Sequence, residues 1–168
     1  MKEIRIAIAD DNKPMVEFMK EFIEERSNLK IYRTVTSSKE EIEMMNNDKI
    51  DLIITDIMRK GESISGLDII KQAEKEKRKE KFILLTASSE KELEYLTNYK
   101  IPSNIIGYLK KPFFDWNIII TELEKAVSII ENIPEEHSNK KSNNNTIIPK
   151  NALEKIKDRI KEIFSIKV

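Results

Sequence analysis

The stretch IRIAIADDN, residues 4–12, places two carboxylates directly after a run of apolar residues. The run from Ile4 to Ala9 is typical of a buried β-strand, because nearly continuous apolar strands belong to parallel sheets that helices cover on both faces. Asp10 and Asp11 follow side by side, and each repels the other. The stretch therefore indicates a parallel sheet with a site at its edge, where another group must compensate two negative charges.

Further apolar runs and amphipathic segments follow in alternation. The expected strands cover residues 4–9, 30–35, 50–55, 81–86 and 105–109, and the expected helices cover residues 14–23, 38–47, 66–79, 89–99 and 115–132. The first helix has an apolar stripe at helical spacing, made of Met15, Phe18, Met19, Phe22 and Ile23. Because successive parallel strands connect by right-handed crossovers, this order predicts an α/β fold, a doubly wound five-stranded parallel sheet with helices on both faces.

The composition changes after residue 131. Residues 132–149 are rich in Asn, Ser, Lys and Glu without periodicity, which predicts a flexible linker between a domain of residues 1–131 and a segment of residues 150–168. Apolar residues in that segment recur with 3, 4, 3 spacing, and they are Leu153, Ile156, Ile160 and Ile163. This amphipathic helix is marginal alone, so we expect the C-terminal helical appendage to pack on its own domain or on a second copy in a homodimer.

Charge and cysteine content narrow the classes of function. The chain has 168 residues with 30 basic and 30 acidic side chains, so its overall charge does not favour a nucleic-acid or membrane partner. The absence of Cys excludes a disulfide framework, a thiolate zinc site and a Cys nucleophile. There is no signal-peptide core and no apolar run of about 20 residues, so we expect a soluble, cytoplasmic protein. His137 lies in the linker, where a solvated side chain is the ordinary interpretation.

Polar residues follow the strong strands at their carboxyl ends, and they are Asp10, Asp11, Asp56, Thr86 and Lys111. In a doubly wound parallel sheet these ends share one edge, where ligands bind. Three carboxylates in one place need a cation, and hard oxygen ligands favour Mg²⁺. An Asp pair after a single strand is more often a helix cap, so the metal interpretation depends on the whole set.

The same set suits phosphoryl transfer, in which a protein mainly positions groups and neutralises charge on the phosphoryl oxygens. Lys111 would pair with one oxygen, and the hydroxyl of Thr86 would donate to another. Asp56 is the expected nucleophile, because a carboxylate can form an acyl phosphate.

The ordered set resembles the receiver domain of response regulators in two-component signalling, which has the flavodoxin-like fold of the chemotaxis response regulator. The resemblance covers about residues 1–131. It rests on the acidic pair in IADDN, the acceptor in LIITDIM, the threonine in LLTAS, the aromatic residue in GYLKKPF and the lysine before the proline, which are Asp10 and Asp11, Asp56, Thr86, Tyr108 and Lys111. Lys110 is the alternative lysine, but Lys111 adjoins Pro112.

The resemblance implies a phosphorylation switch. A histidine kinase or phosphotransfer protein would phosphorylate Asp56 in a Mg²⁺-dependent reaction, and the main-chain carbonyl of Met58 would complete the metal ligands Asp10, Asp11 and Asp56. Thr86 would then move toward the phosphoryl group and Tyr108 would rotate inward. The surface of helix 4, strand 5 and helix 5 would change its partners. Such a domain is not an enzyme, and assists only its own phosphorylation and dephosphorylation.

The sequence departs from the family near the acceptor, where Arg59 and Lys60 replace the usual Met-Pro and Gly66 arrives about two residues late. The stretch TNYKIPSNI, residues 97–105, is also longer than usual. Two alternatives stay open, a receiver fragment of a longer transcriptional regulator and a Mg²⁺-dependent aspartyl-phosphate phosphatase of the haloacid-dehalogenase type. The phosphatase needs a second acid two residues after the nucleophile, where this chain has Met58. A flavin-binding module would need a phosphate-cradling loop in place of the acidic DDNKPM.

Overall fold

The structure is a computed structural model that describes residues 3–98 and 100–133. Strands and helices alternate along the chain as β1 (Ile6–Ala9), α1 (Lys13–Arg26), β2 (Ile31–Val35), α2 (Ser38–Asn47), β3 (Leu52–Asp56), α3 (Gly66–Lys75), β4 (Lys81–Thr86), α4 (Glu90–Leu96), β5 (Ile105–Lys110) and α5 (Asn117–Glu131). All strand pairs are parallel, in the order β2-β1-β3-β4-β5. The predicted doubly wound sheet is confirmed. The linker after Ile133 and the helix expected over 150–168 lie outside the described residues.

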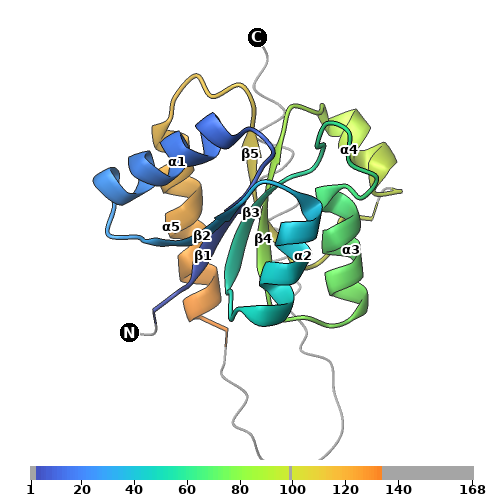
Figure 1. Cartoon of the computed structure of the whole chain (residues 1–168), viewed down its shortest axis with the longest axis horizontal. Helices are drawn as coiled ribbons and strands as arrows, with labels where there is room; N and C mark the ends of the chain where they lie inside the picture. Colours follow the sequence, from blue (N-terminus) through green and yellow to red (C-terminus); the bar gives the residue numbers. More distant parts are fainter. Residues whose placement is uncertain (1–2, 99, 134–168) are drawn as a thin grey trace, which may run out of the picture.

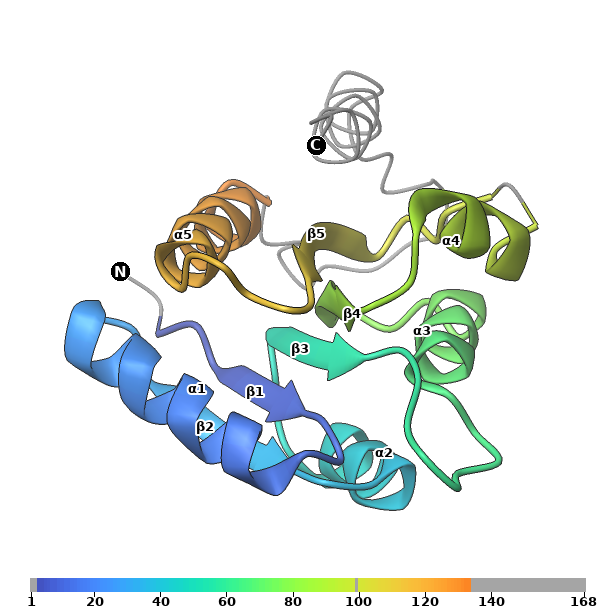
Figure 2. The ribbon, with the colours of Figure 1, turned by 90° about the horizontal axis from the view of Figure 1, so that it is seen from above.

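Helices cover both faces of the sheet, with α1 and α5 on one face and α2, α3 and α4 on the other (Figures 1 and 2). Strand β1 shows the physical reason. Ile6 and Ile8 belong to the core beneath α1 and α5, whereas Ala7 and Ala9 belong to the opposite core, and all four side chains are fully buried. A strand buried on both faces needs apolar residues at every position, as the opening sequence has. Within the described residues, no helix has the length and apolar character required to cross a bilayer.

Helix α1 buries most of the predicted stripe but not Phe18. Its buried residues are Val16, Met19 and Ile23, whereas Phe18 is 50% exposed. Met19 and Ile23 of the predicted stripe are therefore confirmed as buried, and the buried face is displaced from Phe18 toward Val16. The reason lies in α5, because Trp116 at its start sits beside α1 and meets Phe18 edge-on, with 4.6 Å between ring centroids. The aromatic residues pack at the rim of the core, which leaves the smaller Val16 to face the sheet.

Helices α3 and α4 end earlier than predicted, at Lys75 and Leu96. In each case a residue with positive φ follows, Lys77 at 55° and Asn98 at 50°. A left-handed residue just past the last turn is the usual way for a helix to stop. The starts agree better with the sequence, because Ser65 and Ser89 form capping boxes with acidic side chains three residues later.

Candidate functional site

The carboxyl ends of the strands bring the predicted polar residues to one edge of the sheet. Asp10 follows β1 directly, Asp56 is the last residue of β3, and Thr86 is the last residue of β4. Lys111 follows β5, and its main-chain N–H donates to the carbonyl of Thr86 at 2.8 Å. The parallel register holds these ends level, since Asp56 is paired with Leu85, next to Thr86.

The acidic cluster consists of Asp10, Asp11 and Asp56. Each offers a carboxylate oxygen, and these oxygens all lie within 4.8 Å of one another. Asp10 is 1% exposed and Asp56 is 5% exposed, whereas Asp11 lies at the surface. Hard oxygen ligands on a half-open edge suit a divalent cation that keeps part of its water, as Mg²⁺ does. The donor set therefore fits the metal expected from the sequence.

The ammonium of Lys111 brings a positive charge to the acidic cluster. Its Nζ lies 2.6 Å from Oδ2 of Asp10 and 3.3 Å from Oδ2 of Asp56. Burial raises the pKa of Asp56 above its ordinary value of 3.8, the ammonium of Lys111 opposes this, and the charge of Asp10 adds to it. Asp56 is thus a carboxyl group partly stripped of water, with an ammonium at its side.

Thr86 and Tyr108, the two expected switch residues, share one partner. The hydroxyl of Thr86 accepts from the main-chain N–H of Ser88 at 2.9 Å, and the hydroxyl of Tyr108 donates to the carbonyl of Ser88 at 3.2 Å. Tyr108 is 3% exposed, so its ring already lies inward in this structure. The residue between them, Ser88, links the two and was missed in the sequence, because a serine in a loop carries no periodic signal.

Main-chain N–H groups hold the carboxylates of the cluster. Asp10 accepts from Asn12 at 2.8 Å and Asp11 accepts from Lys60 at 3.0 Å. The N–H of Met58 points at Oδ1 of Asp56 over a longer 3.4 Å. Hydrogen bonds of this kind orient a carboxylate. The two groups from the loop after β3 therefore face the acidic cluster.

The structure explains why a glycine stands at position 66, even though it arrives later in the loop after β3 than in the family. A Cβ at this residue would overlap the main-chain carbonyl oxygen of Asp56 and lie 2.9 Å from Oγ1 of Thr55. Its N–H donates to the carbonyl of Ile57 at 3.1 Å. The loop is longer than expected, and it still returns a glycine to the back of the acceptor, where no side chain fits.

Sequence reasoning also missed a buried ion pair behind the cluster, between Arg59 and Glu41. In the sequence Arg59 appeared only as a departure from the family near the acceptor, and Glu41 was not singled out. A single signal was available, since an arginine so close to a buried strand end calls for an acidic partner. Its partner could not be read from the sequence, because α2 and the loop meet only in the folded domain.

Comparison with known proteins agrees with this arrangement. The family model of the response regulator receiver domain matches residues 6–124. The response regulator SaeR of Staphylococcus aureus (strain USA300) is 32% identical over 115 residues, which cover 68% of this chain and 47% of SaeR. The chain thus spans about half the length of the curated relatives that it matches. These relatives do not favour the phosphatase considered for the sequence.

Solved receiver structures share the fold. The receiver domain of the Francisella response regulator 1452 is 27% identical with a TM-score of 0.58, covering 74% of this chain and 98% of its own. TrrA of Thermotoga maritima, solved in complex with Mg²⁺-BeF, is 28% identical with a TM-score of 0.60, covering 73% and 98%. A signal receiver domain from Vibrio parahaemolyticus has a TM-score of 0.66 at 19% identity, covering 81% and 100%. The chain belongs to the response-regulator receiver family.

Proposed function

We propose that this chain is a phosphoacceptor response regulator, in which Asp56 receives a phosphoryl group from a histidine kinase or phosphotransfer protein. The observation that carries the proposal is the placement of Asp56, whose carboxylate lies among two further carboxylates and 3.3 Å from the ammonium of Lys111. The SaeR and TrrA resemblances support the same role. Localisation in the cytoplasm, where such kinases present their phosphohistidine, is part of the proposal.

The residues of the edge divide the work of phosphoryl transfer. A carboxylate oxygen of Asp56 forms the new O–P bond as the N–P bond of the phosphohistidine breaks, and the released imidazole takes up a proton. Lys111, which already contacts Asp56, is placed to pair with a phosphoryl oxygen. Asp10, Asp11, Asp56 and the Met58 carbonyl would hold Mg²⁺, which when bound neutralises the carboxylates and the phosphoryl oxygens. Hydrolysis of the acyl phosphate at the same site would return the domain to its resting form.

The switch would work through Ser88. Thr86 accepts the Ser88 N–H here, and a hydroxyl that accepts one hydrogen bond can also donate its own proton to a phosphoryl oxygen. Movement of Thr86 toward that oxygen would strain or break the bond to Ser88, and Ser88 would carry the change to Tyr108. The loop between β4 and α4 would then shift, which alters the surface of α4, β5 and α5.

Acetyl phosphate with Mg²⁺ tests this function. We expect one acid-stable, base-labile phosphoryl group per chain, located at Asp56 by mass spectrometry. Asp56→Asn should take up none, while Asp51→Asn, at the other end of β3, should label normally. Full labelling of Asp56→Asn, or a wild-type chain that stays unlabelled with both reagents present, would refute the assignment.

A further inference from the structure

Arg59 places a guanidinium behind the candidate site, away from solvent. Its side chain and that of Glu41 on α2 are both 0% exposed, and Nη2 of Arg59 pairs with Oε2 of Glu41. Taking two charges out of water is expensive, and an apolar pair often gives equal or better stability. The buried pair therefore needs an explanation other than stability alone.

The guanidinium contacts residues that directly precede the carboxylates of the site. Nη2 of Arg59 donates to Oγ1 of Thr55 at 2.8 Å and to the carbonyl of Ala9 at 3.4 Å. Thr55 precedes Asp56 in β3, and Ala9 precedes Asp10 at the end of β1. One planar group thus joins the ends of both strands to the loop that carries it.

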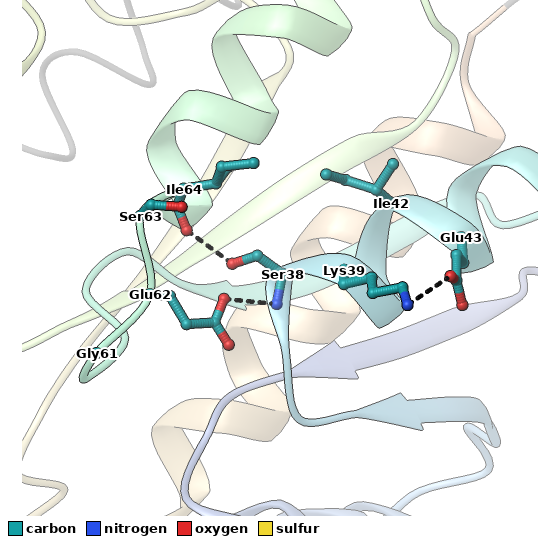
Figure 3. A pocket seen from close by; sticks show the side chains of 8 residues that line it. All are labelled: Ser38, Lys39, Ile42, Glu43, Gly61, Glu62, Ser63 and Ile64. Atoms are coloured by element: carbon teal, nitrogen blue, oxygen red, sulfur yellow. Dashed lines mark hydrogen bonds and ion pairs between the residues drawn. The ribbon is translucent and has the colours of Figure 1, made fainter.

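Ser38, at the start of α2, fastens the rest of the same loop. Its hydroxyl accepts from Nη1 of Arg59 at 2.9 Å and donates to the carbonyl of Ile64 at 2.7 Å. Its main-chain N–H donates to the carboxylate of Glu62 at 2.7 Å, and Figure 3 shows both bonds to the loop residues. The loop from 57 to 65 is therefore tied to α2 near both of its ends.

The tied loop directs two N–H groups at the acidic cluster. Met58 donates toward Asp56 and Lys60 donates to Asp11, while the side chain of Arg59 between them points into the protein. The side chain of Met58 is 62% exposed, so it points to solvent, opposite to the side chain of Arg59. If Arg59 lost its anchor, both N–H groups would lose their fixed direction.

We propose that Arg59, anchored by Glu41 and Ser38, is a positioning residue that sets the metal and phosphoacceptor geometry through the N–H groups of Met58 and Lys60. The proposal rests on the proposed function of Asp56. Arg59 acts from behind and touches neither the metal nor the phosphoryl group, so its effect passes through the loop and the strand ends.

Two variants of the full chain separate positioning from folding. Glu41→Leu/Arg59→Met removes both charges together, which avoids leaving one buried charge unpaired. Arg59→Lys keeps the charge, but a single ammonium cannot reproduce a planar fork with several partners. Arg78→Met is the matched control. Arg78 also donates to a carbonyl of α2, that of Met45, and to the carboxylate of Glu80. It lies in the loop before β4, at the end of that strand opposite to Thr86.

The readouts are hydrogen exchange of the Met58 and Lys60 amides without metal, and the Mg²⁺ dissociation constant from NMR titration. Both Arg59 variants should exchange these amides faster and bind Mg²⁺ about tenfold more weakly, the lower end of what outer partners of metal ligands contribute. Arg78→Met should lower the melting temperature and change neither readout. Wild-type exchange and Mg²⁺ affinity in a folded Arg59 variant would overturn the proposal. If acetyl phosphate failed to label Asp56 in the wild type, the proposed function would be refuted. The exchange rates would still test the positioning role of Arg59.

Discussion

The ammonium of Lys111 lies 2.6 Å from Oδ2 of Asp10, although 101 residues separate them in the chain. The pair exists because β1 and β5 are parallel strands of one sheet and end at the same edge. It also means that Lys111 serves two carboxylates, since Asp56 lies 3.3 Å from the same nitrogen. In the unphosphorylated protein, Lys111 therefore contacts Asp10 and Asp56. The phosphoryl group proposed for Asp56 would arrive at the same place.

Lys111→Ala should separate metal binding from switching. The variant keeps all three carboxylates, so Mg²⁺ should still bind and acetyl phosphate should still label Asp56. Without the ammonium, the phosphoryl group should no longer shift the NMR signals of Thr86 and Tyr108. The unphosphorylated variant should lose about 3 kcal/mol in free energy of unfolding, because Asp10 and Asp56 lose a buried cation. Wild-type shifts on phosphorylation would contradict the assigned role of Lys111.

Asp11→Ala should abolish Mg²⁺ binding, because it removes the exposed carboxylate through which a partly hydrated ion reaches the site. The titration is followed by the fluorescence of Trp116 or by NMR. Trp116 packs on Phe113, two residues after Lys111, with 4.9 Å between ring centroids, so it lies close enough to report on the edge. An identical Mg²⁺ response in the variant and the wild type would show that the metal is held elsewhere. Asp115→Ala, next to the reporter, is the control for a direct effect on its fluorescence.

Asp56→Asn should stabilise the metal-free protein at neutral pH. Burial raises the pKa of Asp56 above 3.8, so the folded chain binds the proton more tightly than the unfolded chain. Charging Asp56 as the pH rises therefore costs stability, and the variant escapes that cost. We expect a higher melting temperature at pH 7, and each 1 kcal/mol gained would raise it by roughly 2–4 °C in a chain of this length. The gain should shrink as the pH falls through the folded pKa toward 3.8.

Asp68→Asn provides the control of opposite sign. Hydrogen bonds from the hydroxyl and the N–H of Ser65 lower the pKa of Asp68 in the capping box of α3. Its contribution to stability is present at neutral pH and is lost as the pH falls through its folded pKa. The variant should therefore be less stable than wild type at pH 7, by about 0.3–1 kcal/mol, the usual contribution of a negative charge near a helix N-terminus. Parallel pH profiles for the two variants would contradict at least one of the two assignments.

Gly66→Ala should destabilise the domain and disturb the acceptor together. The new Cβ would meet the carbonyl oxygen of Asp56, and backbone at the end of a central strand cannot yield as a side chain can. Urea unfolding should show a loss of at least about 2 kcal/mol, within the range of overpacked cores. Gly61→Ala is the control, because no atom of the described residues lies within 4 Å of the added Cβ and only the φ of +77° opposes a side chain. A loss no larger than that of Gly61→Ala would show that β3 adjusts without strain.

The segment 150–164 should be protected from hydrogen exchange in the full chain. Its four apolar residues could each contribute about 1.5–3 kcal/mol when buried, before ordering costs, so packing on protein is favoured over exposure. A chain that ends at Asn132 serves for comparison in analytical ultracentrifugation. A change in assembly between the two chains would assign the packing to a second copy, and unchanged assembly would assign it to its own domain. An unprotected segment with identical assembly would leave the stripe without either role.

The strands and the edge of the site were within reach of the sequence. Apolar runs mark buried strands, β4 was predicted with the bounds that the structure has, and serine caps mark the starts of α2, α3 and α4. Because right-handed crossovers make such strands parallel, the residues that follow them must share one edge. Asp10, Asp56 and Lys111 therefore meet for a reason that depends only on local patterns and topology.

Contacts between elements needed the tertiary structure. Phe18 on α1 meets Trp116 at the start of α5 instead of the sheet, and the partner of Arg59 depends on the approach of α2 to a loop. The periodicity of apolar residues is nearly the same for slightly different rotations of a helix and for different paths of a loop. The exact rotation of α1 and the path of the Arg59 loop therefore could not be predicted from it. The side-chain contacts that orient a loop depend on which elements pack together in the folded domain. The sequence by itself thus determined which groups gather at the edge, and the tertiary structure decided how each of them is held.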